Sequence, residues 1–256
     1  AVALKSVLRS RGVALEVVAV LHGCRDSSAE VLARLAARDH RVIVIEASPT
    51  IALGAALELG RARCRAPLIA RMDADDVMHP DRLAADVRWL LERPAVGAVA
   101  CRARIAPRHA AGGGRHAGLV AYLAWQNAAL TAADHARELW IEQPLCQPAT
   151  TFRASALTAV GGWRARPAPF PEDYDLYLRL ANAGIAIEKR PVFHHAWRVH
   201  VTTTSRLPRD LLADVKAQHL VVRFTLGARP VIICGAGKEV RRIAQVLDAL
   251  TSRLQQ

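Results

Sequence analysis

Short β-branched runs alternate with helical segments through the first hundred residues, and this alternation limits the folds open to the chain. The apolar runs predict buried strands at residues 15–21, 42–45, 67–71 and 95–101. Helical patterns separate them at residues 2–9, 27–38, 51–64 and 81–92. Strands that alternate with helices predict a parallel sheet with right-handed crossovers. We therefore expect an α/β fold with a mostly parallel central sheet flanked by helices.

The second half of the chain is less regular. The sequence predicts helices at residues 119–142, 154–160, 171–183 and 207–223, and extended segments at residues 144–153 and 185–193. Gly161 and Gly162 should end the helix at residues 154–160, because glycine tolerates left-handed backbone. We divide the chain into a main domain, residues 1–205, and a C-terminal appendage of a helix and a strand-turn-helix unit, residues 206–256.

The appendage contains the turn Gly235-Ala236-Gly237 after an apolar strand, as in one unit of a Rossmann fold. Val240 stands where the dinucleotide fingerprint needs a third glycine. Glu239 follows Lys238 where a phosphate loop needs Ser or Thr. An NAD(P)-dependent oxidoreductase is one alternative, but it rests on this turn alone, and we expect no NAD(P) binding.

Composition limits the setting in which the chain works. The 256 residues suit one α/β domain or a domain with a short appendage, and no apolar run is long enough to predict a transmembrane helix. The five cysteines form no C-x-x-C pair, which argues against a zinc or redox motif and suits a reducing cytosol. The chain begins without Met in a helical pattern, so we expect it to be truncated there.

The formal net charge is +12, from 35 Lys and Arg against 23 Asp and Glu. Such a charge attracts phosphates, nucleic acids or an anionic membrane. The basic residues are scattered and no nucleic-acid-binding module is present, so we do not expect nucleic acid as a partner. The predicted location is cytoplasmic, and peripheral contact with an anionic membrane face is the alternative that the charge leaves open.

Three carboxylates, Asp73, Asp75 and Asp76, directly follow the apolar run Pro67-Leu68-Ile69-Ala70. Ligands gather at the carboxyl ends of strands in parallel sheets. Carboxylate oxygens there would suit Mg²⁺ or Mn²⁺ held against a diphosphate. Taken alone, the cluster is equally well explained as an acidic turn before the next helix.

A second acidic motif, Glu172-Asp173, opens the predicted helix at residues 171–183. Acidic residues in a first helical turn are ordinarily explained by the helix dipole. The loop-like segment 161–169 could, however, present this helix start to a cleft. A carboxylate about 100 residues beyond the first cluster is what a transfer reaction with two sites needs.

The order of these motifs, together with Pro80-Asp81-Arg82-Leu83 and Gly161-Gly162-Trp163, resembles the family-2 glycosyltransferases of GT-A fold over residues 1–205. The resemblance implies a nucleotide-diphospho-sugar transferase fold, and it gives roles to residues of both motifs and of the segment after residue 196. The resemblance implies that the metal is bound by Asp75, Asp73 and His200. It implies that the nucleotide-sugar is bound by Asp73, Arg71, Asp76 and Arg198. For catalysis it implies Asp173 as the base, with Glu172 beside it. Arg198 and His200 are equally well explained as surface or core-edge residues.

The implied reaction is a metal-assisted, inverting transfer of a sugar to an acceptor hydroxyl. A divalent ion would neutralise the diphosphate leaving group. Asp173 would accept the proton of the hydroxyl as it attacks the face opposite the leaving group. The resemblance points to a UDP-sugar donor, and to a glycan or lipid-linked acceptor in cell-surface glycan synthesis.

The chain departs from the family pattern at the nucleotide-binding end. The family usually opens with a strand and a Pro-x-x-Asn loop, and we expect this sequence to start after them. The acidic stretch that usually follows the next strand is replaced by Leu21-His22-Gly23-Cys24-Arg25-Asp26. A degenerate, non-catalytic nucleotide-sugar-binding domain is therefore the alternative hypothesis.

Overall fold

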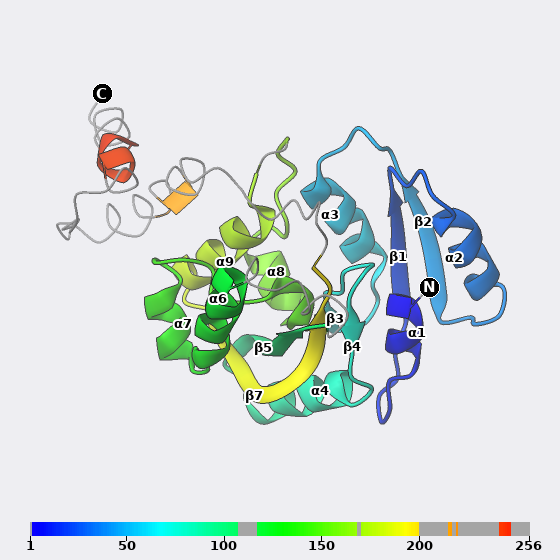
Figure 1. Ribbon diagram of the computed structural model, residues 1–256, viewed down its shortest axis with the longest axis horizontal. Coiled ribbons are helices and arrows are strands. Elements are labelled where there is room, and N and C mark those ends of the chain that lie inside the picture. Colours follow the sequence, from blue (N-terminus) through cyan, green and yellow to red (C-terminus); the bar gives the residue numbers. More distant parts are fainter. Residues whose placement is uncertain are drawn as a thin grey trace.

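The computed structural model describes residues 2–106, 117–167, 170–199, 215, 216, 219 and 241–246. Two sheets with helices on their faces make up this part of the chain (Figure 1). The first half contains α1 Val2–Leu8, β1 Val17–His22, α2 Ser28–Ala36, β2 Val42–Ala47, α3 Leu53–Arg63, β3 Leu68–Ala70, β4 Val77–Met78, α4 Arg82–Glu92 and β5 Val96–Ile105. The second half contains α6 Ala117–Ala128, α7 Ala132–Glu138, the 3₁₀ turn η1 Gln147–Ala149, β6 Thr150–Arg153, α8 Ala154–Ala159, α9 Glu172–Asn182 and β7 Ala186–Trp197.

The smaller sheet is the parallel pair β1 and β2, in a register that runs from Val17 opposite Val42 to His22 opposite Ala47. These strands and the connecting α2 form the βα repeat that the β-branched runs predict. α3 follows β2 and packs against β1 (Figure 1). The α/β class is therefore confirmed.

The larger sheet has five strands in the order β3-β6-β5-β7-β4 and is mixed. Only β5 and β7 are parallel neighbours in it, whereas β6 runs antiparallel to both β3 and β5, and β4 antiparallel to β7. The prediction of a mostly parallel sheet is wrong here. The alternation of strands and helices describes only consecutive units, and β6 instead arrives from the helical segment after residue 117 and inserts between earlier strands.

Local signals account for two further features. The helix predicted at residues 119–142 is two helices, because Thr131 and Asp134 form a capping box that starts α7. Gly161 and Gly162 have φ angles of 74° and 62°, which confirms that they end α8 in left-handed backbone. Most of the appendage, including the Gly235-Ala236-Gly237 turn, lies outside the described residues, as does the glycine-rich loop near residue 112.

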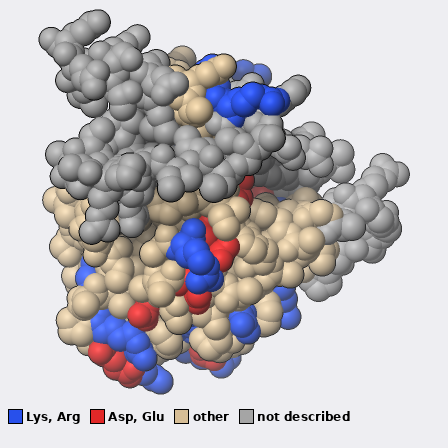
Figure 2. Space-filling model, turned by 90° about the vertical axis from the view of Figure 1, so that its left-hand side faces the viewer, with Lys and Arg blue, Asp and Glu red and all other residues tan. Residues whose placement is uncertain are grey.

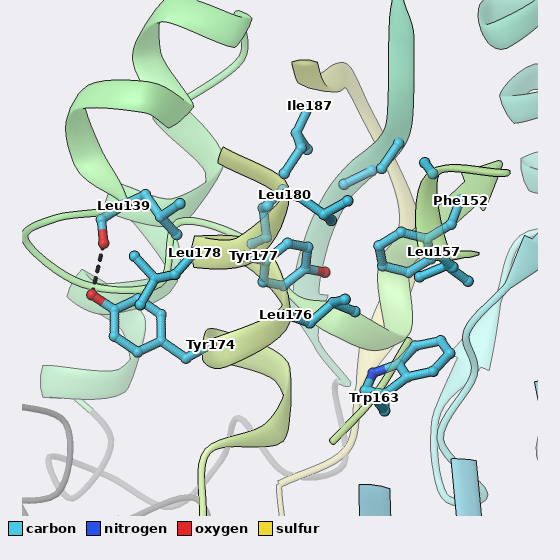
Figure 3. Close-up of a cluster of buried hydrophobic side chains, with 14 of the residues drawn as sticks. Leu139, Phe152, Leu157, Trp163, Tyr174, Leu176, Tyr177, Leu178, Leu180 and Ile187 are labelled. Carbon is cyan, nitrogen blue, oxygen red and sulfur yellow. Dashed lines mark hydrogen bonds between the residues drawn. The ribbon is translucent and has the colours of Figure 1, made fainter. Parts of the chain in front are cut away.

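The main core lies between α9 and the larger sheet (Figure 3). α9 is buried on nearly all sides, and its Tyr174, Leu176 and Tyr177 side chains are at most 1% exposed. The Tyr174 hydroxyl donates a 2.7 Å hydrogen bond to the Leu139 carbonyl, which satisfies the polar atom of a buried ring (Figure 3). A helix held this way gives the residues of its first turn a fixed position.

Three expectations from composition concern the distribution of basic side chains, membrane-spanning helices and the state of the cysteines. On the face in Figure 2, the described Lys and Arg side chains are scattered, and some of them lie next to Asp and Glu, rather than forming one basic area. Among the described helices, none is long and apolar enough to cross a membrane. The described cysteines, Cys24, Cys64, Cys101 and Cys146, are free thiols.

Candidate active site

The first carboxylate cluster occupies the loop between β3 and β4, as its position after an apolar run predicts. One carboxylate oxygen from each of Asp73, Asp75 and Asp76 lies within 4.8 Å of the others. In the part of the chain that the structure describes, this is the one group of metal-ligating side chains so placed. Hard oxygen ligands at this spacing fit Mg²⁺ or Mn²⁺.

The three aspartates differ in their surroundings, and Asp76 is fully buried. Its Oδ2 accepts a 2.7 Å hydrogen bond from His195 Nε2, and its Oδ1 accepts one of 2.9 Å from the Arg198 backbone N–H. Asp76 therefore anchors the loop to β7, and the nucleotide contact predicted for it stays a prediction. Buried polar atoms need such partners, and here both oxygens have one.

The protonation of His195 follows from its neighbours. A carboxylate oxygen accepts, so the 2.7 Å hydrogen bond to Asp76 Oδ2 places the proton of His195 on Nε2. Nδ1 is then the acceptor that faces the Arg82 guanidinium, at 3.5 Å. Burial lowers the pKa of His195, which favours this neutral ring.

Two arginines hold the backbone of the same loop. Arg71 pairs with Asp73 Oδ1 at 2.6 Å, and its backbone N–H donates to the Thr150 carbonyl on β6. Arg82, at the start of α4, is fully buried and donates to the carbonyls of Pro148 and Arg71. The loop is thus tied to β6, β7 and α4 at once, which limits the movement of its carboxylates.

The second acidic motif stands in the first turn of α9. Asp173 Oδ1 accepts from the Tyr174 backbone N–H at 2.7 Å, and Oδ2 accepts from the Gln143 side-chain amide at 3.0 Å. Burial raises the pKa of Asp173, while these two donors oppose the rise. Burial and the nearby Asp173 charge raise the pKa of Glu172 to about 7.

The two motifs act on each other electrostatically although a hundred residues separate them. The Arg71 cation lowers the pKa of both Glu172 and Asp173, and the Asp73 charge raises that of Glu172. Coulomb interactions weaken with distance, so charges that act on each other's pKa lie near one another. The loop after β3 and the start of α9 therefore face one region.

The remaining predicted residues have mixed outcomes. Arg198 is partly buried and contributes its backbone N–H to Asp76. His200 lies outside the described residues, so its predicted metal contact stays a prediction. Sequence reasoning gave no role to Gln143 or His195, since a single Gln or His carries no recognisable pattern.

Two solved structures with bound nucleotide-sugars match this fold. TarS of S. aureus, solved with UDP-GlcNAc, matches with a TM-score of 0.66 at 12% identity, over 98% of this chain and 67% of the TarS chain. The mannosyltransferase PcManGT of Pyrobaculum calidifontis, solved with GDP-Man and Mn²⁺, matches with a TM-score of 0.55 at 19% identity, over 97% and 70%. These matches confirm the GT-A fold.

Sequence comparison gives the family. The model of glycosyl transferase family 2 matches residues 1–159, and the chain belongs to this family. The amylovoran biosynthesis glycosyltransferase AmsE of Erwinia amylovora is 24% identical over 176 residues, which are 69% of this chain. The chain spans 61% of the length of AmsE.

Proposed function

We propose that this chain transfers a sugar from a nucleotide-diphosphate donor to an acceptor hydroxyl, with inversion at the anomeric carbon. The observation that supports it is the proximity of the two acidic motifs, since the charges of Arg71 and Asp73 both act on the pKa of Glu172. Family membership makes sugar transfer the natural chemistry for such a pair.

The donor side of the site is assigned to Asp73 and Asp75. One carboxylate oxygen of each lies within 4.8 Å of the other and of an Asp76 oxygen, which is a spacing that suits a shared divalent ion. A bound Mg²⁺ or Mn²⁺ would supply charge neutralisation for the diphosphate leaving group. Arg71 adds a cation beside Asp73 that can attract a phosphate oxygen once the donor enters.

Asp173 is assigned as the base. Its carboxylate accepts the proton of the acceptor hydroxyl while that oxygen forms its bond to the anomeric carbon and the bond to the diphosphate breaks. A raised pKa suits this task, because a stronger base removes the proton more effectively at neutral pH. Glu172, with a pKa near 7, is assigned to hold the acceptor as a hydrogen-bond partner.

The class of donor rests on the structural relatives. TarS was solved with UDP-GlcNAc and PcManGT with GDP-Man, so UDP- and GDP-sugars are the donors to test first. The acceptor class, a glycan or a lipid-linked sugar, rests on the biosynthetic role in the name of AmsE. A cytoplasmic location with peripheral membrane contact belongs to the same proposal.

The test is the exchange Asp173→Asn, with Asp39→Asn on the turn before β2 as the matched control. The Asp173 variant should lose transfer by at least about 100-fold, the usual contribution of a positioned base, while donor binding measured by thermal shift persists. The Asp39 variant should keep wild-type transfer. Normal transfer by the Asp173 variant would refute the base assignment.

A second experiment tests the metal site and uses Asp75→Asn with Mn²⁺ titration. We expect weaker Mn²⁺ binding by calorimetry and a donor-induced thermal shift that no longer depends on Mn²⁺, since a hard anionic ligand is lost. Unchanged Mn²⁺ affinity would place the metal elsewhere or exclude it from this loop.

A degenerate nucleotide-sugar-binding domain is the second candidate. His22 at the end of β1 favours it, because this imidazole is bonded to the Ile51 carbonyl at 2.9 Å where the family usually has an acidic base-recognising residue. Saturable donor binding without hydrolysis or transfer in the presence of Mn²⁺ would support this candidate over the enzyme.

A further inference from the structure

Gln143 is bound to the assigned base in a way that fixes the orientation of its amide. Its Nε2 donates to Asp173 Oδ2 at 3.0 Å and to the Leu145 carbonyl at 3.1 Å. Carbonyl and carboxylate oxygens can only accept, so the nitrogen end of the amide has to face them. Gln143 is therefore a donor to Asp173.

The segment that carries Gln143 is itself held by residues from other elements. The Tyr122 hydroxyl and the Gln126 amide, both on α6, donate to the Gln143 carbonyl at 3.1 and 2.9 Å. On β7, Lys189 Nζ donates to the Pro144 carbonyl at 2.8 Å and also to the Gln126 carbonyl. The backbone that carries the Gln143 side chain is thus held by contacts that lie outside both acidic motifs.

We propose that Gln143 is a positioning residue, whose side-chain amide orients the Asp173 carboxylate and keeps it ionised while it waits for the acceptor proton. This inference rests on the proposed role of Asp173 as the base. Each carboxylate oxygen has two lone pairs, so the bonds from Gln143 and from the Tyr174 backbone leave acceptor capacity for the substrate hydroxyl.

Several charged and titratable groups act on Asp173 besides the Gln143 amide. Glu172 lies beside Asp173 on α9, and Arg71 acts from the loop after β3. Tyr122 on α6 and Tyr177 on α9 both have raised pKa values, mainly through burial, and remain neutral phenols near the carboxylate. Burial favours the protonated acid, and among the groups that favour the carboxylate the Gln143 amide has the largest effect.

The experiment follows the titration of Asp173 directly and needs neither donor nor acceptor. Protein labelled with ¹³C at the aspartate carboxyls is titrated by NMR, and the Asp173 signal is assigned by its absence in Asp173→Asn. Aspartate labelling leaves the neighbouring Glu172 silent. In Gln143→Met the Asp173 midpoint should rise by about one to two pH units, the effect of one hydrogen bond to a charged group.

Gln126→Met is the matched control, because it removes the same amide from the same network without touching Asp173. The Tyr122 hydroxyl still holds the Gln143 carbonyl in that variant, so the Asp173 midpoint should stay where it is in the wild type. If Gln143→Met does not fold, Gln143→Glu keeps the shape of the side chain and should raise the midpoint further, because a second carboxylate then faces the first.

An Asp173 midpoint that is the same in wild type and in the folded Gln143 variants overturns the inference. An equal shift in the Gln126 control also overturns it, since the effect would then come from general loosening of the segment. Failure of the proposed function is seen separately, as normal sugar transfer by Asp173→Asn.

Discussion

The exchange His195→Leu tests whether Asp76 anchors the carboxylate loop. It removes the Nε2–H that donates to Asp76 Oδ2 at 2.7 Å, and it leaves a buried charge with an unsatisfied oxygen. A hydrogen bond to a charged group contributes about 1.5–3 kcal/mol. The contact from Arg82 to Nδ1, at 3.5 Å, is too long to add much. We expect the free energy of unfolding to fall by about 2–3 kcal/mol.

The assay is urea denaturation at pH 7 with EDTA present, so that metal binding does not contribute. The matched control is His194→Leu, the same exchange at the neighbouring position of β7. His194 stacks on His79 with ring centroids 4.7 Å apart, and among the described residues no carboxylate is hydrogen-bonded to it. The control should lose less than about 1 kcal/mol, as exchanges away from buried networks usually do.

The same variant should bind Mn²⁺ about 10- to 100-fold more weakly, as is typical when the residues that support metal ligands are lost. Equal unfolding free energies for His195→Leu and His194→Leu would refute the reasoning. Asp76 would then be stabilised by the Arg198 backbone N–H alone, and the link between β7 and the metal loop would be unimportant.

Two further predictions concern stability. Gly54→Ala should lower the free energy of unfolding, measured in urea, by about 1–3 kcal/mol, because the new Cβ would lie 2.1 Å from the Arg164 carbonyl oxygen. Gly118→Ala is the control: it has open space around it and should be neutral or stabilising. Equal effects of the two exchanges would contradict this contact. Burial lowers the pKa of His135 to about 3, whereas the unfolded residue binds a proton below about 6.5. The His135 ring should therefore lower the free energy of unfolding by about 2 kcal/mol as the pH falls from 7 to 5. In His135→Leu the free energy of unfolding should depend less on pH over this range, and an unchanged dependence would speak against a neutral buried ring.

Local patterns predicted most of the helices and strands because their signals are themselves local. The β-branched runs mark β1, β2 and β5, and the carboxylates do follow β3. The capping box that starts α7 is a local signal of the same kind, a Thr three residues before an Asp. Propensity and periodicity suffice for features of this kind.

Pairing between distant strands could not be predicted in the same way. β6 lies between β3 and β5 through contacts that no short window contains. The site shows the same limit, since Asp73, Asp75 and Asp76 read alike in sequence, and only the fold buries Asp76 beside His195. Gln143 lies in a loop that contains no recognisable motif, and only the fold brings its side chain to Asp173 on α9.

The anchoring of Asp76 also has a consequence for the order in which the protein assembles. Its two hydrogen-bond partners, His195 and Arg198, lie 119 and 122 residues further along the chain. Until β7 has joined the sheet, burial of this carboxylate would cost more than it returns. Contacts across such separations form late, because the entropy of closing long loops opposes them. During synthesis, the carboxylate loop should therefore stay hydrated and without fixed geometry until β7 has left the ribosome.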